Sequence, residues 1–244
     1  MLDLTGRTAL VTGSTQGIGR AVAERLVAAG ASVVVSARTA RDVESTAATL
    51  AADARGTVVG IPADVGAYMD CERLVAESVA ALGGLDILVN NAGLGIMKPI
   101  TEMQWEEWRA QIDVNMGGVW ACTRAAIPHL REAGAREAGA WVINIGSLAG
   151  RNAFAGGTGY NASKFGLLGM TEAMMLDLRQ LGIRVSLVMP GSVNTDFGRH
   201  PATPGRGWKL EAADCAEAVM QLLAYPKGAH VSRIEMRPAM PPQK

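Results

Sequence analysis

The chain has 244 residues, 49% of them hydrophobic, which is enough for a sizeable core in one large α/β domain or two small ones. Its 23 basic and 23 acidic residues cancel, so nothing indicates a nucleic acid or another polyanion as a partner. No apolar run approaches the roughly 20 residues that span a membrane.

The three cysteines, Cys71, Cys122 and Cys215, are far apart, odd in number and without metal-ligand spacing. We therefore expect buried thiols in a reducing compartment and no metal site. The first residues carry an acid early and lead into a strand, which is unlike a signal peptide. The expected location is the cytoplasm.

A short apolar run, residues 8–11, leads into a glycine-rich turn and then into a helical pattern that Gly30 ends. Strand, glycine turn and helix form the first half of a dinucleotide-binding unit, in which the helix N-terminus offers N–H groups to a pyrophosphate. The spacing is G-x-x-x-G-x-G rather than the commoner G-x-G-x-x-G, so a plain tight loop is the alternative. The predicted cofactor contacts in this turn are Gly13, Ser14, Thr15, Gln16, Gly17, Ile18 and Gly19.

The second strand, residues 32–36, ends at Ala37 and Arg38, where an acidic side chain would bind the ribose hydroxyls of NAD. Ala37 leaves room for a 2′-phosphate and Arg38 supplies charge for it, so the sequence favours NADP(H), with NAD(H) as the second choice. A solvated arginine at a helix start is the alternative interpretation.

Strands then alternate with helices to the end of the chain, and each strand is almost continuously apolar. This pattern predicts a doubly wound, Rossmann-like α/β fold in a single domain, residues 1–244, with a parallel sheet of about seven strands and helices on both faces. Thr101 and Gln104 are predicted to form a capping box at the start of one helix. The later strands are predicted at residues 57–61, 85–90, 141–145, 184–189 and 231–236, and the later helices near 41–52, 70–82, 101–131, 160–181 and 211–225.

The polar features of the chain come directly after predicted strands, at the carboxyl edge where such sheets bind ligands. Beyond the glycine turn and Arg38, these features are Asp64, Asn91, Ser147 and a turn over residues 190–195. Their shared position favours one functional site at this edge.

Tyr160 and Lys164 lie four residues apart at the start of a helical pattern, so their side chains share one face. An ammonium group beside a tyrosine favours the phenolate and lowers the tyrosine pKa from its ordinary value of about 10. Ser147 is expected to meet the tyrosine over a substrate carbonyl. Two alternatives remain open: a chance surface pair for the short tyrosine–lysine motif, and a solvent-facing side chain or a local bend for Asn115, which lies inside a helical pattern.

Taken together, these motifs resemble the classical group of the short-chain dehydrogenase/reductase family over nearly the whole chain. The resemblance implies an NAD(P)-dependent enzyme that transfers a hydride between its cofactor and a carbonyl or secondary-alcohol substrate. The residues that carry it are the Thr12–Gly19 turn, Asp64, Asn90-Asn91-Ala92-Gly93, Asn115, Ser147, Tyr160-x-x-x-Lys164 and Pro190-Gly191-x-Val193-x-Thr195.

The resemblance also implies roles for these residues. Tyr160 would give or take the proton, and Ser147 would position and polarise the carbonyl. Lys164 would lower the tyrosine pKa and hold the nicotinamide ribose, while Asn115 would hold a water in a proton relay. The implied cofactor contacts are Asp64 and Val65 at the adenine, Asn91 on the adenosine side, Val193 and Thr195 at the nicotinamide carboxamide, and also Ala92, Gly93 and Pro190.

Two features depart from the family pattern. Gln16 stands where relatives that prefer NADP often carry a basic residue, so Arg38 alone indicates NADP(H). The Ser232–Pro238 ending is more like the branch with 3-hydroxy acid dehydrogenases, although the chain also resembles 3-oxoacyl-carrier-protein reductases closely. We expect a 3-oxoacyl or 3-hydroxy acid substrate, with a broad ketone or aldehyde reductase as the alternative.

Two other functions compete with this one. A serine hydrolase would need Ser147 in G-x-S-x-G with a histidine partner, but the local sequence is Gly-Ser-Leu-Ala-Gly, and His129, His200 and His230 fall at expected surface positions. A catalytically silent nucleotide-binding regulator would share the fold but have no use for a tuned tyrosine.

The expected substrate pocket is largely apolar. Arg151 or Arg199 could bind a carboxylate or a carrier phosphate, and the Gly- and Pro-rich segment 196–207 is predicted to be a mobile lid. The expected lining is Leu94, Ile96, Met97, Phe154, Phe197 and Trp208.

The helix that begins near Tyr160 is apolar on two opposite faces, and the sheet can cover only one of them. We expect a second subunit to cover the other face in a homodimer or homotetramer, with a neighbouring helix of the same chain as the alternative. That other face carries Ala162, Phe165, Gly169, Ala173 and Leu176.

Overall fold

The computed structural model describes residues 2–197 and 207–241. Within them, seven parallel strands form one sheet in the order β3-β2-β1-β4-β5-β6-β7. The order reverses direction between β1 and β4, which is where doubly wound sheets bind their ligands. The predicted fold is confirmed. The strands are β1 (Thr8–Thr12), β2 (Ser32–Ser36), β3 (Val58–Gly60), β4 (Ile87–Asn90), β5 (Ala140–Ile145), β6 (Ile183–Pro190) and β7 (Arg233–Met236).

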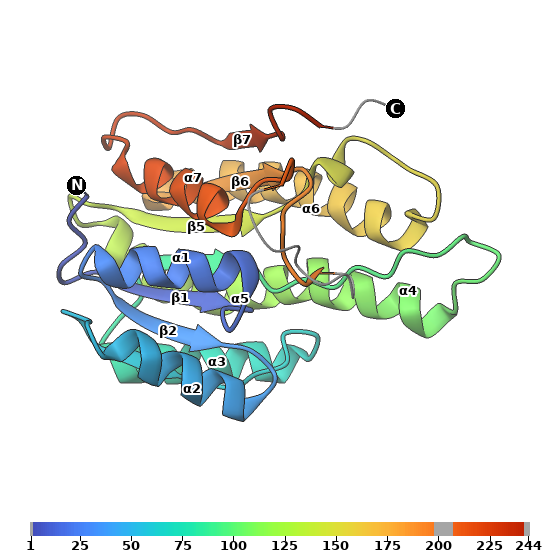
Figure 1. Cartoon of the computed structure of the whole chain (residues 1–244). Coiled ribbons are helices and arrows are strands. Elements are labelled where there is room, and N and C mark those ends of the chain that lie inside the picture. Colours follow the sequence, from blue (N-terminus) through green and yellow to red (C-terminus); the bar gives the residue numbers. More distant parts are fainter. Residues whose placement is uncertain (1, 198–206, 242–244) are drawn as a thin grey trace.

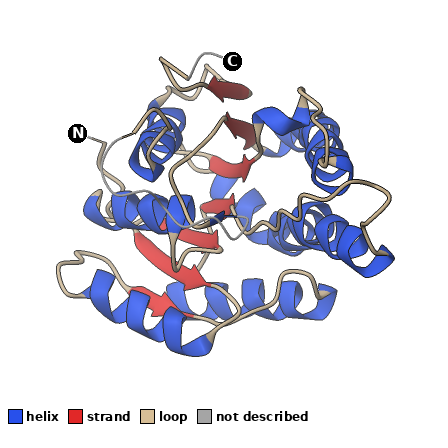
Figure 2. Ribbon diagram, turned by 45° about the vertical axis from the view of Figure 1, so that its right-hand side comes forward, coloured by secondary structure: helices blue, strands red, loops and turns tan. Residues whose placement is uncertain are grey.

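Helices cover both faces of this sheet, which forms the central layer in Figure 2. The α-helices are α1 (Gly17–Ala28), α2 (Ala40–Ala51), α3 (Tyr68–Leu82), α4 (Trp105–Ile112), α5 (Gly118–Gly134), α6 (Thr158–Leu178) and α7 (Ala212–Ala224). Alternate residues of a strand point to opposite faces, and this produces two apolar cores. Val11 and Val33 belong to the core with α1 and α7, whereas Leu10 and Val34 belong to the core with α3 and α5. No helix of the described residues is long and apolar enough to span a membrane.

The predicted capping box at Thr101 and Gln104 is wrong. Pro99 O accepts from the backbone N–H groups of Glu102 and Met103, which closes a turn before the helix. The capping box is formed one turn later, where the Glu107 carboxylate accepts from Gln104 N at 3.1 Å, and α4 therefore begins at Trp105.

The long helix predicted over residues 101–131 is divided in two. A π-helical turn, η1 (Asp113–Gly117), separates α4 from α5 and contains Asn115. Such turns insert an extra residue into a helix and occur often at functional sites. Two short 3₁₀ turns complete the described helices, η2 (Leu148–Gly150) after β5 and η3 (Arg179–Leu181) after α6.

Buried amides fix α6 to the sheet. Asn90 and Asn144 are paired in register on β4 and β5, and Asn90 Nδ2 donates to Asn144 Oδ1 at 2.9 Å. Asn144 Nδ2 in turn donates to Thr171 Oγ1 on α6 at 2.9 Å. All three side chains are buried, so sliding or rotating α6 would leave polar groups unsatisfied in the core.

Candidate active site

The turn between β1 and α1 has a backbone that only glycine adopts easily. Gly13 and Gly17 have φ angles of 62° and 56°, in the left-handed region. A Cβ at Gly19 would lie 2.3 Å from Gly13 O and from Asn91 Nδ2. The first turn of α1 has no acidic residue, and its N-cap, Gln16, makes no side-chain capping bond. The positive end of α1 is therefore not neutralised locally, and the turn fits a pyrophosphate.

Two predicted cofactor contacts, Asn91 and Ser14, use their side chains to hold this turn. Asn91 Nδ2 donates to Thr12 O at 3.0 Å and to Gly13 O at 2.8 Å. Ser14 Oγ donates to Val11 O at 2.7 Å and accepts from Ser36 N at 2.9 Å. These polar atoms are engaged inside the protein, so their first effect is to shape the glycine turn.

The neighbouring strands β2 and β3 bring Arg38 and Asp64 to the same edge of the sheet. Arg38 is exposed and has no ion pair within residues 2–197 and 207–241. Asp64 Oδ1 accepts from Gly66 N at 2.9 Å, and Val65 O accepts from Cys71 Sγ at 3.4 Å. The loop after β3 is therefore fixed next to an arginine whose charge is available.

Tyr160 and Ser147 lie near each other at the carboxyl edge of the sheet. Tyr160 is 8% exposed, and burial raises its pKa above the ordinary value, while a hydrogen bond with Ser147 acts in the opposite direction. Ser147 lies at the end of β5, where its Oγ also accepts from Ala149 N at 3.1 Å. The two hydroxyl groups can therefore address one substrate oxygen.

Lys164 lies beneath the tyrosine ring. Its Nζ is 5.8 Å from the ring centroid of Tyr160 and donates to Ile145 O at 3.1 Å. Burial lowers the pKa of Lys164 to about 8. The expected lowering of the tyrosine pKa is not the direction found, because burial of the phenol outweighs the other influences on it.

Asn115 faces the interior rather than the solvent. Its side chain is fully buried, with Oδ1 accepting from Leu94 N and Nδ2 donating to Leu94 O, both at 2.8 Å. Nδ2 also donates to Ser163 Oγ at 2.9 Å, and Ser163 Oγ donates to Tyr160 O at 2.8 Å. The sequence analysis missed Ser163, although its place three residues after Tyr160 puts it on the same side of the helix.

The segment after β6 returns to the glycine turn. Val193 forms a parallel bridge with Leu210, and Asn194 N donates to Leu210 O at 2.8 Å. A Cβ at Gly17 would lie 3.4 Å from the Thr195 methyl carbon. The segment that follows Pro190 at the end of β6 thus borders the same space as the glycine turn. Ala92 and Gly93 follow β4, which lies between β1 and β6 in the sheet.

The expected apolar lining is only partly brought together. The rings of Phe197 and Tyr160 have centroids 5.8 Å apart, and a Cβ at Gly95 would lie 2.6 Å from Phe197. Leu94 and Ile96 are half-buried. Met97, Phe154 and Trp208 are exposed, and Phe197 is also 40% exposed despite its contact with Tyr160.

The candidate cations and histidines do not form a second kind of site. Arg151 pairs with Glu235 at 2.5 Å, and Arg199, His200 and most of the expected lid lie outside the described residues. His230 Nε2 contacts Ser186 Oγ and Val185 O rather than Ser147, so a hydrolase arrangement is not formed there. The described chain holds no cluster of three or more side chains suited to a metal ion.

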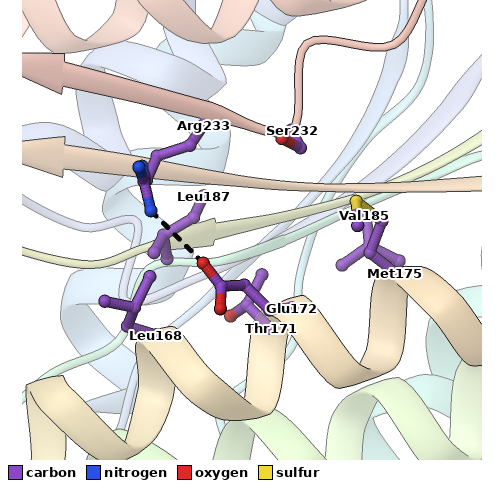
Figure 3. Close-up of a pocket in the computed structure, with 8 residues that line it drawn as sticks. All are labelled: Leu168, Thr171, Glu172, Met175, Val185, Leu187, Ser232 and Arg233. Carbon is purple, nitrogen blue, oxygen red and sulfur yellow. Dashed lines mark hydrogen bonds and ion pairs between the residues drawn. The ribbon is translucent and has the colours of Figure 1, made fainter.

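A hollow of about 320 Å³ lies outside this site, between α6 and strands β6 and β7 (Figure 3). Arg233 donates to Glu172 at 3.2 Å across it. None of the predicted catalytic residues lines the hollow. Its lining is Leu168, Thr171, Glu172, Met175, Val185, Leu187, Ser232 and Arg233.

The sequence of the chain is similar to those of known oxidoreductases. The family model described as short chain dehydrogenase matches residues 7–203. An uncharacterized oxidoreductase of Staphylococcus aureus (strain MRSA252) is 34% identical over 238 residues, which cover 98% of this chain and 100% of that protein.

Solved structures resemble the whole fold. An alcohol dehydrogenase from the archaeon Thermococcus sibiricus, complexed with 5-hydroxy-NADP, has a TM-score of 0.88 and 27% identity. A metagenomic short-chain oxidoreductase in complex with NADP has a TM-score of 0.83 and 33% identity. Each match covers 98% of this chain and 99% of the other chain.

Proposed function

The chain belongs to the short-chain dehydrogenase/reductase family, and we propose that it transfers a hydride between NADP(H) and a carbonyl or secondary-alcohol substrate, with Tyr160 as the general acid or base. The observation that carries this proposal is the buried Tyr160, whose pKa the Ser147 hydroxyl influences and whose ring lies next to Lys164 at the carboxyl edge of the sheet. A binding protein without catalysis would need none of these contacts.

Each catalytic side chain has one task in this mechanism. The bound nicotinamide supplies or accepts the hydride. Ser147 donates a hydrogen bond to the substrate carbonyl oxygen, and the Tyr160 hydroxyl gives its proton to that oxygen as the carbonyl carbon is reduced. In alcohol oxidation the same proton returns to Tyr160. Burial raises the pKa of Tyr160 and so favours the protonated phenol, which is the form that carbonyl reduction requires.

The remaining residues hold the reacting groups in place. The ammonium of Lys164 lies 5.8 Å from the ring centroid and stabilises the phenolate when it forms. Asn115 holds Leu94 on one side and, through Ser163, the first turn of α6 on the other. We assign Asn115 the task of positioning these two segments, and we also propose that it holds the water of the proton relay.

NADP(H) is the proposed cofactor. The glycine turn and the start of α1 would hold the pyrophosphate, and the exposed guanidinium of Arg38 would hold the 2′-phosphate. The two similar solved structures carry NADP or a derivative of it, which supports this choice. NAD(H) is the weaker alternative because Gln16 adds no positive charge.

The proposed substrate is an uncharged 3-oxoacyl ester or a related ketone. The lining formed by Leu94, Ile96 and Phe197 is apolar, and Arg151, which could have bound a carboxylate, is paired with Glu235. A free 3-hydroxy acid would find no available cation among the described lining residues. This favours an esterified or neutral substrate over a free acid.

A second copy of the chain is the proposed partner, in a homodimer or homotetramer. Phe165 and Leu176 on the outer face of α6 are 45% and 54% exposed, so no other described helix of the chain covers that face. An apolar face left open on a well-packed domain is typical of a subunit interface. The three cysteines are unpaired, which supports the proposed location in the cytoplasm.

The test is a panel of ketones, 3-oxoacyl esters and 3-hydroxy acids, assayed with NADPH and NADH. Tyr160→Phe is expected to lower kcat by about 10²- to 10⁴-fold while cofactor affinity stays nearly constant. The matched control is Tyr225→Phe, since Tyr225 is exposed at the end of α7. A wild type without turnover on the whole panel would overturn the function, and an active Tyr160→Phe enzyme would overturn the mechanism.

A further inference from the structure

A fully buried glutamine lies outside the proposed mechanism. Gln111, near the end of α4, is 0% exposed and is the one buried residue described for that helix. The other side chains of α4 include the exposed Trp105 and two residues in ion pairs, Glu107 and Arg109. A buried amide requires hydrogen-bond partners, so its contacts indicate what it holds.

Gln111 joins two segments that border the active site. Its Oε1 accepts from Ile96 N at 3.0 Å, and its Nε2 donates to Glu107 O at 3.3 Å. On its other side lies Gly159, where a Cβ would be 2.4 Å from Nε2. The amide therefore fills the space between the loop after β4 and the first turn of α6, which lie at the same end of the molecule in Figure 1.

Gln111 lies one helical turn before Asn115, and both side chains accept a hydrogen bond from the backbone of the loop after β4. Asn115 binds the backbone of Leu94, and Gln111 binds the backbone of Ile96, two residues further along the loop. Between them, Gly95 lies directly against Phe197. Two buried amides thus fix a loop whose other side faces the ring that packs on Tyr160.

We propose that Gln111 is a positioning residue for substrate selection, which sets the pocket shape by holding residues 94–97 against the Tyr160 helix. The proposal rests on the reductase function given above. Gln111 does not touch the reacting atoms. It acts through Ile96 and Gly159, so its loss should loosen the pocket wall and weaken the distinction between short and long acyl chains.

The test compares Gln111→Met with Gln111→Glu. Methionine has a similar length but offers no acceptor strong enough for Ile96 N, and we expect the KM for the preferred substrate to rise roughly 10- to 100-fold. The kcat for the smallest accepted ketone and the affinity for NADPH should stay within about threefold. Gln111→Glu keeps a carbonyl acceptor. At a pH where the carboxyl group is protonated, this variant should therefore retain most of the wild-type distinction between short and long acyl chains.

Gln180→Met is the control, because Gln180 is exposed after α6. Should Gln111→Met fail to fold, Gln111→Asn provides the same comparison, since the shorter amide cannot reach Ile96. Unchanged KM and unchanged chain-length preference in a folded variant would overturn the proposal. Equal losses in KM, kcat and cofactor affinity would also overturn it, because they indicate a general structural role. A wild type that turns over separates these outcomes from a failure of the proposed function.

Discussion

The two ends of the sheet are built from different kinds of polar contact. At the amino end, the buried carboxylate of Asp86 accepts from Thr8 N at 2.8 Å and Thr8 Oγ1 at 2.9 Å. It also pairs with Arg136 and, at 3.6 Å, with Arg7. At the carboxyl end, the neutral amides of Asn91 and Asn115 hold the glycine turn and the loop after β4, while the carboxylate of Asp64 holds the loop after β3.

This difference separates stability from function. Charges at the amino end are paired within the chain, so they contribute to folding and have little left for a ligand. At the carboxyl end, neutral amides shape the turns and leave the charges of Lys164 and Arg38 outside any ion pair in the described part of the chain. Free charge and unneutralised helix ends are what an anionic cofactor requires.

Removing the carboxylate at the amino end should have the largest effect on stability. Asp86→Ala leaves the largely buried Arg7 without its ion-pair partner, and we expect a loss of about 3–5 kcal/mol in the free energy of unfolding. The kcat per folded molecule should stay within about twofold, because the site is at the other end. Denaturant unfolding measures the first quantity and active-site titration the second.

The control is Glu24→Ala, which breaks the exposed pair of Glu24 with Arg20 on α1. That change should cost less than about 1 kcal/mol. Equal costs for the two variants would contradict the contrast between the ends.

The opposite result is expected for the buried charge at the carboxyl end. Lys164→Met should lower kcat by about 10²- to 10³-fold, because it removes a charge that stabilises the phenolate. At pH 7 it should raise the free energy of unfolding, since the buried ammonium has no counter-ion among the described residues. Lys227→Met, at an exposed position after α7, is the control. A variant that loses stability together with activity would contradict this interpretation.

Much of both ends could be predicted from the sequence. The apolar runs predicted the five inner strands because residues buried on both faces leave no polar alternation to misread. The edge strands β3 and β7 are only partly buried, and they were predicted from shorter patterns. Ser147 and Arg38 each follow a strand, so parallel topology alone placed them at one edge.

The rest depended on contacts that no local pattern contains. The π-helical turn at Asn115 keeps the apolar spacing of a continuous helix, so the sequence reveals neither its backbone hydrogen bond from Gly118 N to Asp113 O nor the contact of Asn115 with Leu94. Gln111 looks like one more polar residue of a charged helix until the loop after β4 covers it. The direction of the Tyr160 pKa shift depends on tertiary burial, which the spacing to Lys164 does not determine.

The pH dependence of stability tests the contrast between the two ends of the sheet through the titration of Lys164. Burial lowers the pKa of Lys164 from 10.5 to about 8, so below pH 8 the folded state carries a charged, desolvated group. Between pH 8 and 10.5 the folded protein releases this proton while the unfolded chain keeps it, and stability therefore rises with pH by up to roughly 3 kcal/mol. The advantage of Lys164→Met over wild type should shrink over this interval in urea titrations. If the difference in the free energy of unfolding between Lys164→Met and wild type stays constant from pH 7 to 10.5, the lowered pKa of Lys164 is contradicted.

Cofactor choice should depend on the exposed charge at the end of β2. Arg38→Asp removes the proposed 2′-phosphate contact and adds a carboxylate for ribose hydroxyls, so the ratio of NADPH to NADH affinity should fall roughly 10- to 100-fold. Fluorescence titration measures both affinities. The control is Arg41→Asp, at the second residue of α2. Tighter binding of NADH than NADPH to the wild type would exclude the proposed preference.

The smallest effect on the chain itself is expected at Gly169, which tests whether the carboxyl end depends on a second subunit. Nothing beyond its own helix backbone and chain neighbours lies within 4 Å of a Cβ built at Gly169, so a side chain there starts in open space. Replacing a helix-interior glycine should stabilise the isolated subunit by about 1 kcal/mol or less.

If another copy covers this face, Gly169→Lys places a charge in the interface, and light scattering should show dissociation. Activity should then fall with the assembly, because α6 also carries Tyr160. Gly228→Lys, at an exposed glycine with equally open space, should change neither mass nor activity. A monomeric wild type at assay concentration would show that the outer face of α6 has another purpose.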